Sequence, residues 1–133
     1  MSNSGTLELA RRFVRALNEK DAAAIREIYA PDARIWHNFD GKYQTIDENL
    51  KGMYWIHKRL SGINYDVVRL VEIEDGYLQE HVLRGKLPSG EDFAMPACVI
   101  CTVKDGRVVS LQEYLDLTHT VPLTAQRGSH GIG

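Results

Sequence analysis

Strand-like segments joined by three tight turns occupy the second half of the chain, and they constrain its fold more than any other feature. After Gly62 the hydrophobic period changes to two, the period of a β-strand. Three turns interrupt the segments at 74–76, 88–90 and 104–106, and each contains a glycine. The sequence therefore predicts four consecutive antiparallel strands, over 63–73, 77–87, 92–103 and 107–117.

The first half of the chain predicts three helices. Apolar residues recur at helical spacing after Thr6, a candidate N-cap, and a short second helix starts at Asp21 and ends before Pro31. The third starts at Thr45 with Glu48 three residues later, a capping box, and stops at 61–62. A short strand is expected over 34–37. Helices followed by an antiparallel meander indicate the α+β class.

Length and composition limit the class of protein. The 133 residues predict one domain over 1–127, and 128–133 read as a flexible tail or a remnant of cloning. No apolar run reaches the length of a membrane span, and the first residues do not resemble a signal peptide. The net charge is −2, without a run of Lys or Arg. We therefore expect a cytoplasmic protein with no nucleic-acid or membrane partner.

Polar residues on apolar strand faces are the main functional signal. Glu113 stands among Val109, Leu111 and Leu115 on one face of the last strand, where a carboxylate is costly unless it is paired or protonated. Gln79 and His81 share a face of the second strand. If that face points inward, a His81–Glu113 pair can form. The alternative is that Glu113 lies near a rim bonded to water and that His81 is partly exposed.

Two further groups of residues are candidates for the wall of a pocket. Trp36, His37 and Asn38 combine an aromatic ring with hydrogen-bonding side chains before a turn, which suits the mouth of a pocket. Tyr54 and His57 on the third helix could face the same space. Core packing or a surface position would explain each of them as well.

The strand 92–103 is apolar on both of its faces, so it needs cover on both. A symmetric dimer packed through the sheet would supply the second cover, and a helix of the same chain is the alternative. Cys98 and Cys101 lie in this strand, and a C-x-x-C pair can be a redox or metal motif. Residues three apart on a strand point to opposite faces, which disfavours such a motif, so both are read as core cysteines. The histidines show no metal-binding spacing, so no metal site is expected.

Two stretches of the sequence, ALNEKDAAAIREIYAPDARIW and DGRVVSLQEYLD, resemble the SnoaL-like group of the nuclear-transport-factor-like superfamily. The resemblance runs over about 7–117. It implies three helices packed in a cone with a curved, mainly antiparallel sheet, an α+β barrel with a deep apolar pocket, usually in a homodimer.

The site residues of two branches of the superfamily can be placed on particular positions of this sequence. At the places of the Tyr and two Asp residues of ketosteroid isomerases this sequence has Phe13, His37 and Cys98, so the usual oxyanion hole is missing. The resemblance to limonene-epoxide hydrolases implies that five positions line a pocket: Trp36, Asn38, Gln79, His81 and Glu113.

These observations predict an enzyme that needs no cofactor and acts on a small, largely apolar molecule by general acid/base chemistry. The catalytic candidates are His81, Glu113, His37 and Asn38, and the candidates for substrate binding are Trp36, Tyr54, His57, Gln79 and Leu83. Isomerisation, cyclisation, dehydration and hydrolysis all remain open. The alternatives are a non-catalytic protein that binds a small ligand in the same fold, or an interaction protein whose pocket is filled.

Overall fold

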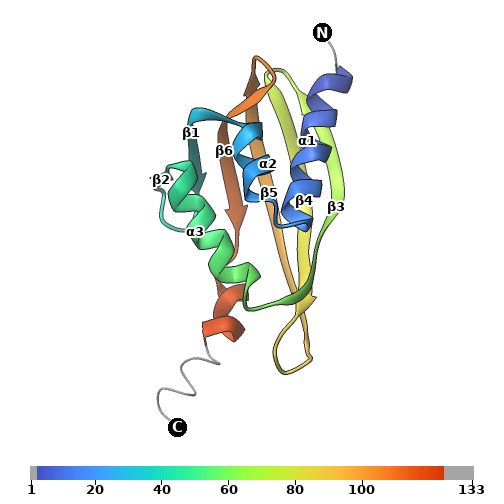
Figure 1. Cartoon of the computed structure of the whole chain (residues 1–133), viewed down its shortest axis with the longest axis vertical. Helices are drawn as coiled ribbons and strands as arrows, with labels where there is room; N and C mark the ends of the chain where they lie inside the picture. Colours follow the sequence, from blue (N-terminus) through green and yellow to red (C-terminus); the bar gives the residue numbers. More distant parts are fainter. Residues whose placement is uncertain (1–2, 125–133) are drawn as a thin grey trace.

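The computed structural model describes residues 3–124 and shows helices first and strands after them (Figure 1). The helices are α1 (Asn3–Asn18), α2 (Ala22–Ile28) and α3 (Ile46–His57). The strands are β1 (Tyr29–His37), β2 (Tyr43–Gln44), β3 (Ser61–Ile73), β4 (Gly76–Lys86), β5 (Asp92–Lys104) and β6 (Arg107–Leu115), and a 3-10 turn, η1 (Leu117–Thr120), follows them. The expected tail, 128–133, lies outside the described residues.

The six strands form one mixed sheet in the order β2-β1-β6-β5-β4-β3. The four strands from β3 to β6 pair antiparallel, as the turns predicted, while β1 pairs parallel with β6. The three helices lie against one face of this sheet (Figure 1). We call the face that packs against the helices the inner face and the opposite one the outer face. The predicted α+β cone of helices and curved sheet is confirmed.

The start of β1 differs from the sequence prediction. The second helix ends at Ile28, and the strand begins at Tyr29 rather than at Arg34. Pro31 therefore lies inside a strand, where a proline cannot donate a hydrogen bond. The structure accommodates it because the pairing of β1 with β6 is irregular between Tyr29 and Arg34. The first helix also begins earlier than predicted, at Asn3, so that Thr6 lies within it.

The capping box at the start of α3 is confirmed. The Thr45 hydroxyl accepts a hydrogen bond from the Glu48 backbone N–H at 3.2 Å, and the Glu48 carboxylate accepts one from the Thr45 N–H at 2.9 Å. These bonds satisfy two of the donors that a helix start leaves unpaired. The helix ends at His57, earlier than predicted, and this places His57 in its last turn.

The main hydrophobic core lies between the helices and the inner face of the sheet. The inner side of α1 contributes Phe13, whose ring packs edge-on against that of Tyr29 with the centroids 5.3 Å apart. Ile35 and Cys101 are fully buried on the sheet side. This packing fixes α1 and α2 over the sheet and leaves space toward α3.

No described helix covers the outer face of the sheet (Figure 1). Val71 and Tyr114 are each 43% exposed there, and Cys98 and Ile100 are half-buried. The prediction that both cysteines belong to the core is therefore right for Cys101 and wrong for Cys98, because the alternation of the strand turns Cys98 outward. Among the described residues, no helix is long and apolar enough to cross a membrane.

Candidate functional site

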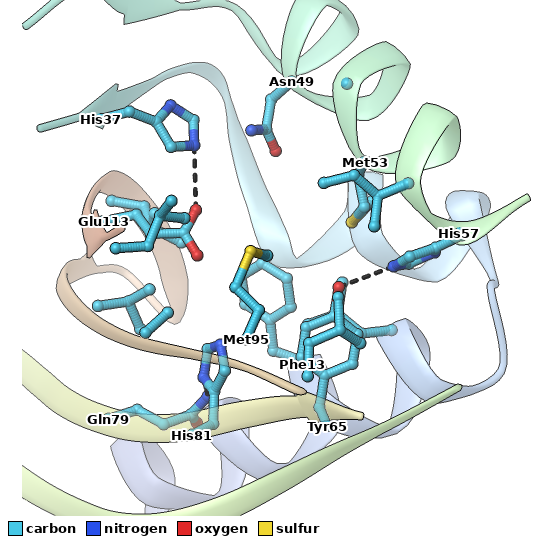
Figure 2. A pocket seen from close by; sticks show the side chains of 18 of the residues that line it. Phe13, His37, Asn49, Met53, His57, Tyr65, Gln79, His81, Met95 and Glu113 are labelled. Carbon is cyan, nitrogen blue, oxygen red and sulfur yellow. Dashed lines mark hydrogen bonds and ion pairs between the residues drawn. The ribbon is translucent and has the colours of Figure 1, made fainter. Parts of the chain in front are cut away.

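A cavity of about 310 Å³ lies between the helices and the inner face of the sheet (Figure 2). Its walls are mainly apolar and include aromatic rings of Phe13, Phe39 and Tyr65. Four pairs of hydrogen-bonded polar side chains interrupt this apolar wall. In one of them the Asn49 amide donates to the Gln44 side-chain oxygen at 3.3 Å. Each of the other three pairs contains one histidine, and these pairs come from different parts of the fold (Figure 2).

The first pair joins His37 to Glu113. The two residues lie opposite each other where β1 runs parallel to β6, and His37 Nε2 is 3.0 Å from a Glu113 carboxylate oxygen (Figure 2). Their side chains are 10% and 21% exposed, so solvent reaches the carboxylate only in part. The Phe39 ring lies 5.0 Å from the His37 ring and is 42% exposed, which places this pair near the surface. A partly enclosed carboxylate fixed by an imidazole can accept a proton from a substrate.

The second pair joins Gln79 to His81 on β4. Residues two apart share a face of a strand, and both side chains are 4% exposed on the inner face, as predicted. The Gln79 amide nitrogen donates a hydrogen bond to His81 Nδ1 at 2.8 Å. The ring proton of a neutral His81 is therefore on Nε2, and burial favours the neutral form because it lowers the pKa of His81, against an opposing effect of the Glu113 charge. His81 thus offers an N–H donor.

The third pair joins His57, at the end of α3, to Tyr65 on β3. His57 Nε2 is 2.7 Å from the Tyr65 hydroxyl oxygen (Figure 2). Burial, helped by the Lys20 charge, lowers the pKa of His57 to about 4, so this imidazole is neutral at pH 7. Burial and the Glu113 charge raise the pKa of Tyr65, which keeps the phenol protonated. The pair is uncharged.

The structure brings six of the nine predicted site residues to the cavity. They are His37, His57, Gln79, His81, Leu83 and Glu113. The expected contact between Glu113 and an imidazole is present, but the partner is His37 and the expected His81 is bonded to Gln79 instead. The parallel pairing of β1 with β6 decides this, because it aligns His37 with Glu113.

The other three predicted residues do not line the cavity. Trp36 points to the outer face, opposite to His37, and its ring packs on Tyr114 at 5.3 Å. The exposed Asn38 side chain accepts a hydrogen bond from the Leu115 N–H at 3.0 Å, so it bridges two strand ends. Tyr54 is 67% exposed and lines a second hollow, formed mainly by residues of α2 and α3. The pocket role predicted for each of them is therefore wrong.

Sequence reasoning missed Tyr65 as a member of the site. Tyr65 lies opposite Leu83 in the antiparallel pairing of β3 with β4. Directly opposite residues share a face, so the inward orientation predicted for Leu83 also implied an inward Tyr65. The missing information was the register of the two strands.

The cavity wall has few charges. Among the described residues that line it, none is Lys or Arg, and Glu113 is the one acidic residue. Within residues 3–124, no three His, Cys, Asp or Glu side chains lie close enough together to hold a metal ion. The chemistry that the described wall residues supply is therefore that of one carboxylate, imidazoles, amides, phenols and a threonine hydroxyl.

The sequence matches one family model, described as SnoaL-like domain, over residues 10–111. No curated protein matches it.

Solved structures with little sequence identity share the fold. AclR from Streptomyces galilaeus, to which a hydroxylase role has been ascribed, is 17% identical with a TM-score of 0.82, over 92% of this chain and 87% of that chain. IdmH from Streptomyces antibioticus, to which a polyketide cyclase role has been ascribed, is 20% identical with a TM-score of 0.79, over 90% and 98% of the two chains. A Catenulispora acidiphila protein with a ketosteroid isomerase-like fold, in complex with trimethylamine, is 18% identical with a TM-score of 0.70, over 84% and 88%.

Proposed function

Because this chain belongs to the SnoaL-like domain family, we propose that it is an enzyme that performs general acid/base chemistry on a small, largely apolar molecule without a cofactor. The observation that carries the proposal is the Glu113 carboxylate, held at 3.0 Å by His37 in the wall of an apolar cavity. An apolar wall retains an apolar substrate, and a fixed base next to it removes a proton.

In this proposal Glu113 is the base, and His81 stabilises the negative charge that develops on the substrate's carbonyl oxygen. The Glu113 carboxylate takes a proton from a carbon next to a carbonyl group, and the electron pair of the broken C–H bond moves to the carbonyl oxygen. The His81 Nε2–H, fixed by the Gln79 amide, donates a hydrogen bond to that oxygen. Return of the proton to another atom would give isomerisation, and attack of the new enolate on a second carbonyl would give cyclisation.

Dehydration and hydrolysis use the same two groups differently. In dehydration Glu113 takes the proton while a hydroxyl group leaves, and in hydrolysis it activates a water molecule. The polyketide cyclase role ascribed to IdmH favours carbon chemistry beside a carbonyl, as does the placement of a donor and a base on one cavity wall.

Deuterium exchange tests the proposal on a simple ketone. 2-Tetralone is neutral and mainly apolar, and NMR in D₂O follows the exchange of the hydrogens beside its carbonyl above the spontaneous rate. We expect Glu113→Gln to lower the protein-catalysed rate about 10²–10⁴-fold and His81→Ala to lower it less. Glu80→Gln, the same change on the outer face of β4, should leave the rate unchanged. Unchanged exchange in both the Glu113 and the His81 variant refutes the assignment.

The second candidate function is a protein that binds a small ligand without reaction. The observation in its favour is that the described wall residues combine aromatic rings with one carboxylate and include no Lys or Arg, which suits an organic cation. The similar Catenulispora acidiphila protein was crystallised with trimethylamine. This function predicts that trimethylammonium binds, that Glu113→Gln abolishes the binding, and that no ketone exchange is catalysed.

We also propose that two copies of the chain associate through the outer face of the sheet. Val71, Ile100 and Tyr114 leave apolar surface open there, and no described helix covers it. A second copy would bury this surface on both chains at once. A cytoplasmic location remains a prediction from the sequence.

A further inference from the structure

The His57–Tyr65 pair has no part in the proton transfer proposed above, although it lies in the wall of the same cavity. Figure 2 shows it on the side of the cavity away from Glu113, with Phe13 and Met95 between the two sites. The cavity therefore has polar groups on opposite sides, at Glu113 and at His57–Tyr65, with apolar side chains between them, and His81 lies beside Tyr65.

The position of Tyr65 is fixed by bonds to its backbone and by the rings around it. The Asn18 side chain, at the end of α1, accepts a hydrogen bond from the Tyr65 backbone N–H at 2.7 Å. The Tyr65 ring packs edge-on against His57 and His81, with centroid distances of 5.7 and 5.4 Å. A phenol held in this way presents its oxygen in one direction, which is the condition for selective recognition.

The pair retains hydrogen-bonding capacity after its own bond is made. Both partners are neutral, so if the Tyr65 hydroxyl donates to His57, its oxygen can still accept a second hydrogen bond. If His57 donates instead, the Tyr65 O–H is free to donate. Unlike His81, whose Nε2–H only donates, this pair can bind either a hydroxyl or a carbonyl group.

We propose that the His57–Tyr65 pair is a second recognition site in the cavity, which binds a hydroxyl or carbonyl oxygen at the end of the substrate remote from the reacting carbonyl. The inference rests on the proposed function, and it names the substrate class. The substrate is a neutral molecule with an apolar middle and an oxygen function at each end. An anionic group is disfavoured because the described lining residues include no Lys or Arg to balance it.

Matched ketones test the inference. 2-Tetralone supplies the reacting carbonyl, and its 6-hydroxy and 7-hydroxy derivatives add a remote hydroxyl group. We expect one of the hydroxy ketones to bind the wild-type protein roughly three- to tenfold more tightly than 2-tetralone, the gain of one buried hydrogen bond. The 6-carboxylate derivative should bind more weakly than 2-tetralone.

Tyr65→Phe removes the hydroxyl and keeps the ring. The ratio of the dissociation constants of 2-tetralone and the preferred hydroxy ketone should therefore fall to about one. Tyr77→Phe is the matched control. Tyr77 lies in the wall of the same cavity, and its buried hydroxyl bonds to Cys101, so its removal should leave the preference for the hydroxy ketone unchanged. In the wild-type protein, the NMR signals of the His57 ring should shift with the hydroxy ketone and not with 2-tetralone. This measurement does not depend on the folding of a variant.

The inference is overturned if the wild-type protein shows no preference, if the preference survives Tyr65→Phe, or if none of the ketones binds. Deuterium exchange in 2-tetralone reports separately on the proposed function. Exchange without a hydroxyl preference refutes the second recognition site alone. A preference without exchange refutes the proposed catalysis and leaves the recognition site in place.

Discussion

The inner and outer faces of the sheet place neighbouring residues of the same strands in opposite environments. On β1, His37 points into the cavity and bonds to Glu113, whereas Trp36 packs on Tyr114 on the outer face. On β5, Val99 is buried and its neighbour Cys98 is only half-buried. In the first case the polar residue is the more enclosed one, and in the second case two apolar residues differ in burial, so residue type alone does not decide burial.

The difference shows what each face requires. Buried polar groups are tolerated when they bond to one another, and three pairs of side chains around the cavity meet this condition. Among the described residues, one Glu72 carboxylate oxygen, opposite Tyr77 on the inner face, is buried without a hydrogen-bond partner. The outer face has apolar side chains that are still exposed within the described structure, such as Val71. Because the inner face is covered by helices and the outer face is exposed within the described structure, the two should respond differently to mutation, to pH and to protein concentration.

The largest expected contrast is in stability. Ile35→Ala on the inner face removes a fully buried side chain and should lower the free energy of unfolding by about 2–5 kcal/mol. Val71→Ala, on the outer face and 43% exposed, should lower it by roughly 0.5 kcal/mol or less at concentrations where the chain is monomeric. Urea denaturation measures both values. Equal losses would mean that the outer face is covered.

A smaller effect is expected on how the free energy of unfolding depends on pH, through the buried histidines around the cavity. Burial lowers the pKa of His57 from 6.5 to about 4, so between these values the unfolded chain binds a proton that the folded chain does not. The contribution of His57 to stability is therefore fully present above pH 6.5 and is lost as the pH falls toward 4. His81 acts in the same direction, because its pKa is also lowered by burial.

Urea denaturation at pH 7.5 and pH 5 measures this loss, which should be on the order of 1–3 kcal/mol. His57→Gln keeps a partner for Tyr65 without the titration, and it should reduce the dependence on pH. His119→Gln, at an exposed position of η1, is the control and should leave the dependence unchanged. A His57→Gln variant with the wild-type dependence contradicts the expectation.

The next effect tests association through the outer face. Tyr114→Glu places a charge on the proposed contact surface and should raise the dissociation constant of the dimer at least tenfold, about 1.4 kcal/mol. Sedimentation over a range of concentrations measures it. Lys104→Glu, an exposed change at the end of β5, should have a smaller effect. A wild-type chain that stays monomeric at high concentration contradicts the proposed dimer.

The smallest effect on stability is expected at Cys98. Cys98→Ser should change the free energy of unfolding by less than about 0.5 kcal/mol, because the side chain is only half-buried. A thiol reagent should label Cys98 in the folded protein and reach Cys101 only after unfolding, since burial raises the pKa of Cys101 to about 12. Mass spectrometry of the labelled protein checks this order. If association covers Cys98, its labelling should slow as concentration rises.

Features with a local signal were predicted from the sequence. The capping box at Thr45 and the glycine turns needed only neighbouring residues, and so did the alternation that turns Gln79 and His81 to the same side. The family resemblance supplied the cone of helices and sheet that these elements build, and the family is confirmed. The partly enclosed position of Glu113 also followed from its own strand.

Features that depend on distant pairing were not predicted. The partner of Glu113 is set by the parallel pairing of β1 with β6, which no local pattern encodes. Alternation along β1 already prevented Trp36 and His37 from both facing the cavity, although their sequence reads as one cluster. The backbone role of Asn38 likewise appears only once β1 lies beside β6.

The parallel pairing of β1 with β6 also has a consequence for biosynthesis. Asn38 and Leu115, which bond across it, are 77 residues apart, so a ribosome working at about 5–20 residues per second needs several seconds to make the second after the first. Just before β6 is made, the nascent chain already contains His37, His57 and His81 but still lacks Glu113. The acidic residue proposed as the base thus leaves the ribosome after the three cavity histidines, and an N-terminal fragment that stops before β6 is expected to be inactive.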